Sequence, residues 1–442
     1  MNQSTLHEAR LPPHEWGFLT QSAFYKYVAY RDVIWRVTQP QMWLVLSIRF
    51  AKELHKLPDD VIGIQKVRRL NFQSDYTYIL PNNPLIQSTI RSDLTLHLPQ
   101  VVGGLSKEVA RTVPEVLVPC EEWNIIAIVS GYVFIGPELC RHPKYLDATK
   151  SFARNAFGAA ASLKQWPKSL CWFAARFVDA RVAELRKQRA NLIEFLTPYV
   201  EERRALRDQA KDSPQDMLQW AVNKAPKFKI DTNAELTNVQ AVLSIVAIET
   251  TTTLATHFLF DIVAHCPEII PEEVRSVLEE NGGVYTAKAL AQMKLMDSVV
   301  KDSLRCNPQS LNSFSRLVKK EVTLSDGTVL PKDETYYPEA NRFNPYRFID
   351  LRSGKAENPL QYQNKELISV TKENISFGFG RHSCPGRFFA SNKIKVIMAE
   401  LLTNYDVRLA DGVTEWYKNI VNGDIVTADA SKAISFKRRG RR

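Results

Sequence analysis

Apolar residues recur at helical spacing along most of the chain, and only short stretches alternate as strands do. The helical spacing predicts helices at Ala174–Arg189, Pro198–Arg207, about Leu236–His265, Ala287–Arg305 and in the residues after Cys384. Residues 316–330 predict two short strands around Asp326-Gly327, a dipeptide typical of a type I′ hairpin turn. The chain is therefore expected to be mainly α with a minor, scattered β component.

Length and composition fit an ordinary globular protein. The chain has 442 residues, 45% of them hydrophobic, which is enough for one large domain or two ordinary ones. Polar stretches at 211–214 and 351–374 predict surface connections, and the second is long enough to suggest a functional loop. The six cysteines are scattered and none forms a C-x-x-C pair, which excludes a disulfide framework and favours a reducing compartment.

The net charge of +10 allows a nucleic acid, an anionic membrane surface or an acidic protein as a partner. The bases are spread along the chain without a nucleic-acid-binding module, so nucleic acid is set aside. Residues 437–442 form the one dense basic cluster and are expected to be a solvated terminus. No secretory signal is visible, and the most apolar stretch, 123–136, is shorter than the roughly 20 residues of a membrane span. Contact with a membrane surface stays compatible with the sequence.

The stretch FGFGRHSCPGRFFA, residues 377–390, places a cysteine just before a helical pattern. The residues that follow divide into apolar Ala390, Ile394, Ile397, Met398 and Leu401 and, on the other faces, polar Asn392, Lys393, Lys395 and Glu400. Pro385 suits the first helical turn, where its missing N–H costs nothing. Cys384 is therefore expected at a helix N-terminus, where the dipole and the N–H groups favour the thiolate.

The residues before Cys384 add to this picture. Gly378 and Gly380 remove side chains and let something flat or bulky approach the backbone, while Arg381 and His382 place donors beside it. A thiolate in this place could be a nucleophile, a metal ligand or a redox thiol, and a buried, inert cysteine is the alternative. A thiol-dependent hydrolase would need His382 as its base, but no acyl-transfer signature accompanies it.

The pattern Phe377-x-x-Gly380-x-His382-x-Cys384-x-Gly386 resembles the heme-binding signature of the cytochrome P450 superfamily. The family usually has arginine where His382 stands, and histidine is common in its fungal members. The resemblance implies heme b as the cofactor, with its iron axially bound by the Cys384 thiolate, which favours O–O cleavage. It also implies the P450 fold, a helical bundle around the heme with small β-sheets.

Two further segments follow in the order that the resemblance implies. Glu249, Thr250 and Thr251 in "SIVAIETTTT" correspond to the family's acid and threonines, which would relay protons. Their alternative is a buried helix whose threonines bond to carbonyls of the preceding turn.

Asp302-x-x-Arg305 stands where the family has Glu-x-x-Arg, which pairs with a later arginine, here Arg347, to brace the heme loop. Aspartate is shorter than glutamate by about 1.5 Å, so its reach to Arg347 is reduced. The alternative is an exposed helical ion pair worth roughly a few tenths of a kcal/mol.

Residues 307–316 resemble the family segment in which Leu311–Phe314 would line the substrate pocket and Arg316 would approach a heme propionate. The resemblance implies that His382, together with Arg381, would hold propionates as well. The segments Tyr132–Leu146 and Pro214–Val222 also resemble fungal members. The likeness therefore covers most of the chain. It is similar to the ent-kaurene oxidase and indole-diterpene oxidase group of fungal secondary metabolism.

The resemblance implies a monooxygenase that inserts one oxygen atom from O2 into a hydrophobic, terpenoid-like substrate in secondary metabolite biosynthesis. Electrons would come from an NADPH-cytochrome P450 reductase, since no flavin or nicotinamide fingerprint is present. The family's location is the endoplasmic reticulum membrane. Because no anchor is recognised in this chain, a cytosolic location and peripheral membrane contact both stay open as alternatives.

One P450 domain is expected over residues 1–442, without the family's N-terminal membrane anchor and without one β-strand segment near 333–336. Losing a sheet strand would leave unpaired backbone groups and a weaker core. The second hypothesis is therefore a truncated, non-catalytic relative that binds heme or a hydrophobic ligand without turnover.

Overall fold

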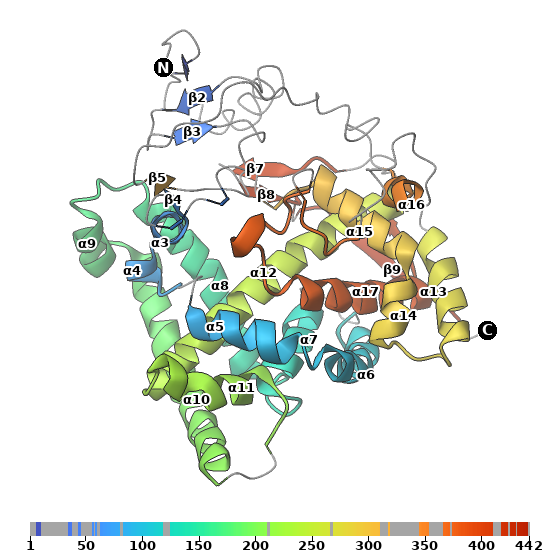
Figure 1. Cartoon of the computed structure of the whole chain (residues 1–442), viewed down its shortest axis with the longest axis horizontal. Helices are drawn as coiled ribbons and strands as arrows, with labels where there is room; N and C mark the ends of the chain where they lie inside the picture. Colours follow the sequence, from blue (N-terminus) through green and yellow to red (C-terminus); the bar gives the residue numbers. More distant parts are fainter. Residues whose placement is uncertain are drawn as a thin grey trace.

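Helix α12, Asn233–His265, runs through the middle of the molecule, and the other long helices are arranged around it (Figure 1). It packs against helices α7, α8, α10, α15 and α17. Its length and apolar composition would allow it to span a membrane, but most of it is buried inside this fold. Its apolar character is therefore that of a core helix.

The computed structural model describes residues 6–9, 34–37, 43–45, 55–56, 58–59, 62–79, 83–117, 124–209, 213–265, 268–309, 317–318, 344–352, 366–371, 374–409, 417–422, 425–429 and 431–440. The other α-helices are α3 (Gln65–Asn71), α4 (Ser74–Thr77), α5 (Pro84–Thr89), α6 (Leu98–Val116), α7 (Asn124–Ile135), α8 (Pro143–Leu163), α9 (Cys171–Phe173), α10 (Ala180–Asp208), α11 (Met217–Lys224), α13 (Ile269–Glu280), α14 (Ala287–Gln292), α15 (Lys294–Cys306), α16 (Arg347–Arg352) and α17 (Arg387–Asn404). Single turns of π or 3-10 helix are η4 (Ile90–Leu94), η5 (Ala174–Val178), η6 (Ala225–Phe228) and η9 (Gly380–His382).

The strands of the described residues form small sheets. They are β1 (Leu6–Ala9), β2 (Ile34–Val37), β3 (Trp43–Val45), β4 (Ile62–Gly63), β5 (Leu317–Val318), β6 (Tyr405–Leu409), β7 (Ile420–Asn422), β8 (Ile425–Thr427) and β9 (Ile434–Arg438). In the three-stranded sheet, β2 pairs in parallel with β1 and antiparallel with β3. The pairs β4–β5, β6–β9 and β7–β8 are antiparallel, and Tyr405 opposite Arg438 sets the register of β6 and β9. The expectation of a mainly α protein with scattered β structure is confirmed.

Two clusters of buried apolar side chains form the core. The larger one joins α5, α6, α7, α11, α13, α15 and α17 to α12. The smaller one lies between α8, η5 and α10. Helix α12 belongs to both, since Leu243 is in the larger cluster and its neighbours Ala241 and Ile245 are in the smaller.

The helices expected at 174–189 and 198–207 differ from the structure. The first is divided into the π turn η5 and the start of α10, because Asp179 is extended and its carboxylate accepts the N–H groups of Arg181 and Val182 as an N-cap. From there α10 continues through Pro198 without a break. A proline inside a helix costs about 3 kcal/mol or more, so the packing of α10 against α8 and α12 must offset it.

The expected helix 287–305 is divided into α14 and α15 at Met293. Met293 is fully buried and its ψ of 75° is not helical, so the helix is interrupted at this one residue. The expected helix at 236–265 is confirmed by α12. Of the expected hairpin, β5 pairs with β4, and the turn at 326–327 lies outside the described residues.

Helix α17 is confirmed after Cys384, but two of its polar positions are not where amphipathic spacing put them. Lys393 and Lys395 are 1% and 5% exposed. Lys395 reaches Asp297 at 2.6 Å, whereas Lys393 reaches uncharged groups, Ser130 Oγ and Ala247 O. The face expected to be polar is therefore partly a core face, held by specific partners for the two amines.

Candidate active site

Cys384 lies in a loop that is folded by its own backbone hydrogen bonds. Its N–H donates to the carbonyl of Phe377 at 2.8 Å, and Ser383 N–H donates to Gly380 O at 3.1 Å. Gly378 and Gly380 have φ of +76° and +67°, which residues with a Cβ rarely adopt. The turn itself therefore requires both glycines.

The position of Cys384 relative to α17 corrects the sequence expectation in detail. Helix α17 begins at Arg387, so Pro385 lies in the preceding turn and not in the first helical turn. Gly386, with φ −84° and ψ 4°, is the N-cap. The turn directs the backbone N–H groups of Gly386 and Arg387 to the sulfur, where their hydrogen bonds lower the pKa of Cys384. The end of the helix thus serves the sulfur although the cysteine is not in it.

Burial is nevertheless the largest influence on Cys384, and it raises the pKa of the thiol above its ordinary value of 9.0. The positive charges of Arg387 and Arg68 act in the opposite direction without overcoming it. The surroundings of the sulfur thus combine backbone donors and positive charges that favour the thiolate with a burial that disfavours it.

The donor set of the site restricts which cation fits. In the part of the chain that the structure describes, no three His, Cys, Asp or Glu side chains come together to hold a bare metal ion. Cys384 offers one thiolate, and a metal bound by it would need its other ligands from elsewhere. An iron porphyrin brings four equatorial nitrogens and needs one axial ligand from the protein, so these residues fit heme.

Arg381 and His382, both expected to hold heme propionates, together bind a carboxylate in the structure. Arg381 Nη2 and His382 Nε2 lie 2.8 Å and 3.2 Å from Oδ1 of Asp59. Burial acts to raise the pKa of Asp59, but the hydrogen bonds and charges of these two residues lower it. Arg91 Nη2 donates to the carbonyl of Arg381 at 3.4 Å. The two side chains have the geometry of a carboxylate-binding pair.

Asp302, Arg305 and Arg347 meet in the structure. Asp302 is fully buried, and its Oδ1 accepts from Arg305 Nε at 2.7 Å and from Arg347 Nε at 2.9 Å. Its Oδ2 accepts the backbone N–H of Asn344 at 2.7 Å. The carboxylate thus ties α15 to the start of α16, and the exposed ion pair considered from the sequence is excluded.

On α12, one stripe is exposed although the helix lies in the core. Val246 is 46% exposed, and Glu249 and Thr250, three and four residues later, are exposed as well. The hydroxyl of Thr250 donates to the carbonyl of Val246 at 2.7 Å. Thr251 instead points into the core and is 4% exposed. The acid and the first threonine therefore share an open face that the second threonine does not.

Some expected site residues cannot be compared. Arg316 and the substrate-lining stretch 311–314 lie outside the described residues, as does the segment 333–336. Other residues at the loop were missed by the sequence reasoning, namely His55, Asp59, Arg68 and Arg387. Arg387 stands beside Gly386 in the quoted stretch and could have been found there. The others precede the loop by more than 300 residues and carry no motif.

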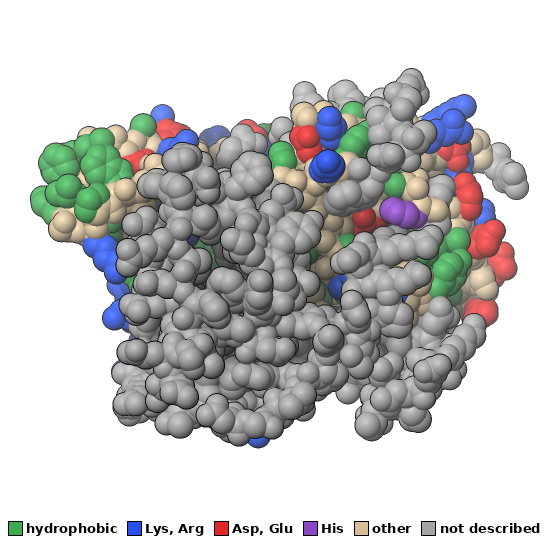
Figure 2. Space-filling view, turned by 90° about the horizontal axis from the view of Figure 1, so that it is seen from above, with side chains coloured by type: hydrophobic (Ala, Val, Ile, Leu, Met, Phe, Trp, Pro, Cys, Tyr) green, Lys and Arg blue, Asp and Glu red, His purple; other side chains and the backbone are tan. Residues whose placement is uncertain are grey.

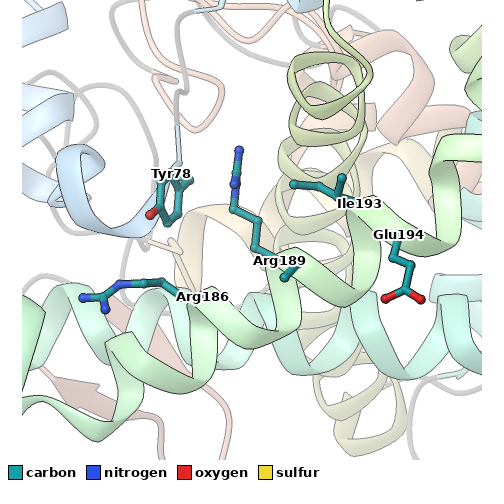
Figure 3. Close-up of a pocket in the computed structure, with 6 residues that line it drawn as sticks. Tyr78, Arg186, Arg189, Ile193 and Glu194 are labelled. Carbon is teal, nitrogen blue, oxygen red and sulfur yellow. The ribbon is translucent and has the colours of Figure 1, made fainter.

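A separate groove of about 370 Å³ lies along α10 (Figure 3). It is lined by Tyr78, Arg186, Arg189, Ala190, Ile193 and Glu194. Arg189 lies over the ring of Tyr78, 4.5 Å from its centroid, and donates to Asn238. None of its lining residues belongs to the expected site, so this groove is distinct from the thiolate loop.

The fold and the site together define a class of mainly helical protein with one cysteine in a glycine-containing turn just before a helix. The family described as Cytochrome P450 matches residues 159–434. Cytochrome P450 monooxygenase adrA of Penicillium rubens is 30% identical over 432 residues, covering 91% of this chain and 83% of that protein. Cytochrome P450 monooxygenase trt6 of Aspergillus terreus is 33% identical over 429 residues, covering 90% and 85%. Cytochrome P450 monooxygenase pyr3 of Aspergillus fumigatus is 33% identical over 407 residues, covering 84% and 75%.

The chain belongs to the cytochrome P450 family. It is an oxygenase with the P450 fold, and the family implies heme held by a cysteine thiolate. The family resemblance read from the Cys384 loop is thereby confirmed.

Proposed function

We propose that the chain binds heme b through Cys384 and inserts one oxygen atom from O2 into a hydrophobic, terpenoid-like substrate. The observation that carries this proposal is the Cys384 loop, a turn with two positive-φ glycines in which the backbone N–H groups of Gly386 and Arg387 are directed to one sulfur. When bound, the heme supplies the activation of O2. The protein contributes binding, orientation and protons.

The donors around the loop would hold the cofactor. Cys384 would bind the iron, and the turns at Gly378 and Gly380, which carry no side chain, would let the backbone lie close to the porphyrin. Arg381 and His382 already bind the carboxylate of Asp59, and the same donors would take a propionate. Arg316 is proposed for the other propionate from the family resemblance alone.

The stripe on α12 would deliver protons. Glu249 can hold a proton on its carboxyl group, and Thr250 can pass one through its hydroxyl, which now donates to Val246 O. Both are exposed on the same face, so they can act on one bound molecule. Thr251, which was grouped with them, is buried and is proposed to support the helix only.

The test is the spectrum of the reduced protein with carbon monoxide. Thiolate ligation gives a red-shifted Soret band, which Cys384→Ala should abolish. Cys171→Ala, which removes a buried cysteine elsewhere in the fold, is the control and should keep the band. A histidine-type spectrum in the wild type would overturn the proposal.

The non-catalytic alternative rested on the aspartate at 302 and on the missing strand. Asp302 does reach Arg347, so the first reason no longer supports it. The second reason concerns residues outside the described part of the chain. We therefore retain the enzymatic proposal, with an NADPH-cytochrome P450 reductase as the electron donor.

We also propose peripheral contact with the endoplasmic reticulum membrane through the aromatic edge, defined as residues Leu170–Val178. Apolar side chains gather at this edge, with basic side chains beside them (Figure 2). Trp172 and Phe177 are 58% and 66% exposed, and their rings contact each other. Six basic and two acidic residues lie in the sequence between positions 164 and 187. Aromatic side chains with basic neighbours suit the interface of an anionic lipid surface.

A further inference from the structure

Lys393 is a buried amine that joins three helices. It lies on α17, and its side chain is enclosed to 1% exposure. Its Nζ donates to Ser130 Oγ on α7 at 2.9 Å and to the carbonyl of Ala247 on α12 at 3.0 Å. The ring of Phe389 lies 5.2 Å from the same nitrogen. This side chain of α17, the helix that follows Cys384, therefore contacts both the central helix α12 and helix α7.

The partners of this amine are all uncharged. No carboxylate in the described part of the chain forms an ion pair with Lys393. Burial lowers the pKa of Lys393 to about 7, and no neighbouring charge contributes to that change. An apolar side chain of similar length would fill this space without that cost. Packing alone thus does not explain a lysine here.

Lys393 and its partner Ala247 both lie close in the chain to residues of the proposed site. Lys393 follows Cys384 by nine residues, and Ala247 precedes Glu249 and Thr250 by two and three. Hydrophobic contacts hold two helices together but are non-directional, so they leave small shifts along the helix axes. A hydrogen bond to one particular carbonyl fixes that shift, because its length and angle tolerate little change.

We propose that Lys393 is a positioning residue for the oxygenase chemistry: it fixes the segment of α12 that carries Glu249 and Thr250 relative to the helix that follows Cys384. This inference rests on the proposed function of those three residues. A misplacement of about 1 Å between reacting groups can cost on the order of 100-fold in rate. The buried hydrogen bond from Lys393 to Ala247 O is thus a means of keeping that distance.

The experiment compares Lys393→Met with the wild type and with Lys395→Met. The control carries the same substitution on the same helix, but Lys395 contacts Asp297 and Leu290 O instead of α12. Two properties are measured: hydrogen exchange of the amides at 246–251, and the C–O stretching frequency of the reduced carbon monoxide complex. The first needs no activity, and the second reports the surroundings of the ligand on the iron.

Lys393→Met should speed exchange at 246–251 on the order of tenfold, the loss of about one hydrogen bond, and should shift or split the C–O band. It should keep the red-shifted Soret band, and Lys395→Met should change none of the three. If the Met variant does not fold, Lys393→Gln is measured in its place, because a glutamine side chain is too short to reach Ala247. The same results for exchange at 246–251 and for the C–O band then support or overturn the inference. Wild-type exchange and a wild-type C–O band in the Lys393 variant would overturn the inference. If the wild type itself shows no red-shifted Soret band with carbon monoxide, the proposed function is refuted instead.

Discussion

The Nε atom of Arg347 lies 2.9 Å from Oδ1 of Asp302, although the aspartate is one carbon–carbon bond shorter than the glutamate usual in the family. The start of α16 lies close to α15, because Asn344 N–H also bonds to Asp302 and Phe348 N–H bonds to Ser298 Oγ at 3.0 Å. The start of α16 therefore lies close enough for the shorter side chain to reach Arg347. The shorter acid keeps the bridge between the two helices.

This arrangement predicts that replacing Asp302 by the longer glutamate does not increase the stability of the fold. Asp302→Glu should lower the free energy of unfolding by about 1–3 kcal/mol, because the added methylene overpacks a fully buried site. Asp302→Ala should cost about 3–5 kcal/mol by leaving the buried arginine unpaired. Urea unfolding monitored by circular dichroism gives both values. The exposed pair Arg69–Asp75 is the control, and Asp75→Ala should cost less than about 1 kcal/mol. A Glu variant more stable than the wild type would contradict the fit.

The exposed stripe on α12 predicts separate effects for neighbouring threonines. Glu249→Gln and Thr250→Ala should lower product formation from a diterpene test substrate roughly 100-fold, because proton delivery contributes about 10² or more. NADPH consumption should continue, with the electrons recovered as hydrogen peroxide. Thr253→Ala is the control, since its hydroxyl only bonds back to Glu249 O at 3.1 Å. Equal coupling in all three variants would exclude this stripe as the source of protons.

Lys393 predicts a specific pH dependence of stability. Its pKa is about 7 in the folded state and 10.5 ordinarily, so between these values the unfolded chain binds more protons than the folded one. This group therefore makes stability rise with pH over that interval, by at most roughly 1.4 kcal/mol per pH unit. Below pH 7 the full cost of burying the charge is present. Lys393→Met should flatten this slope in urea titrations from pH 7 to 10, and an unchanged slope would show that the amine is protonated throughout.

The aromatic edge predicts vesicle binding that depends on its rings. Trp172→Ser combined with Phe177→Ser should reduce sedimentation with phosphatidylcholine–phosphatidylserine vesicles about tenfold or more, because each buried aromatic ring contributes roughly 1.5–3 kcal/mol. Leu96→Ser with Val284→Ser, which removes exposed apolar side chains elsewhere, should leave binding unchanged. If the two double variants bind equally, membrane contact occurs through another surface.

The sequence was sufficient for the features that depend on local spacing. The glycines and the cysteine of residues 377–390 form one turn, so their proximity could be predicted from neighbouring positions, while their role stays a prediction. Helix α12 was likewise predicted correctly, because its long apolar pattern is a matter of local spacing. The acid and threonine at 249–250 were found through family order, but only the structure separates them from Thr251, whose neighbours on other helices cover it.

Features that depend on tertiary packing could not be predicted. Helical spacing placed Lys393 and Lys395 on polar faces, because a lysine carries no signal of an acceptor on a distant helix. The continuity of α10 through Pro198 likewise depends on its neighbours in the core. The reach of Asp302 was judged by side-chain length alone, whereas the approach of the backbone at 344–348 decides it.

The membership of α12 in both apolar clusters has a consequence for engineering. Residues 241, 243 and 245 alternate between the two clusters within less than two turns. Neither cluster can therefore be exchanged for that of a relative while this stretch is kept from the original. Chimeras made to alter substrate choice should place their crossovers outside Asn233–His265, and those with a junction inside it should assemble poorly.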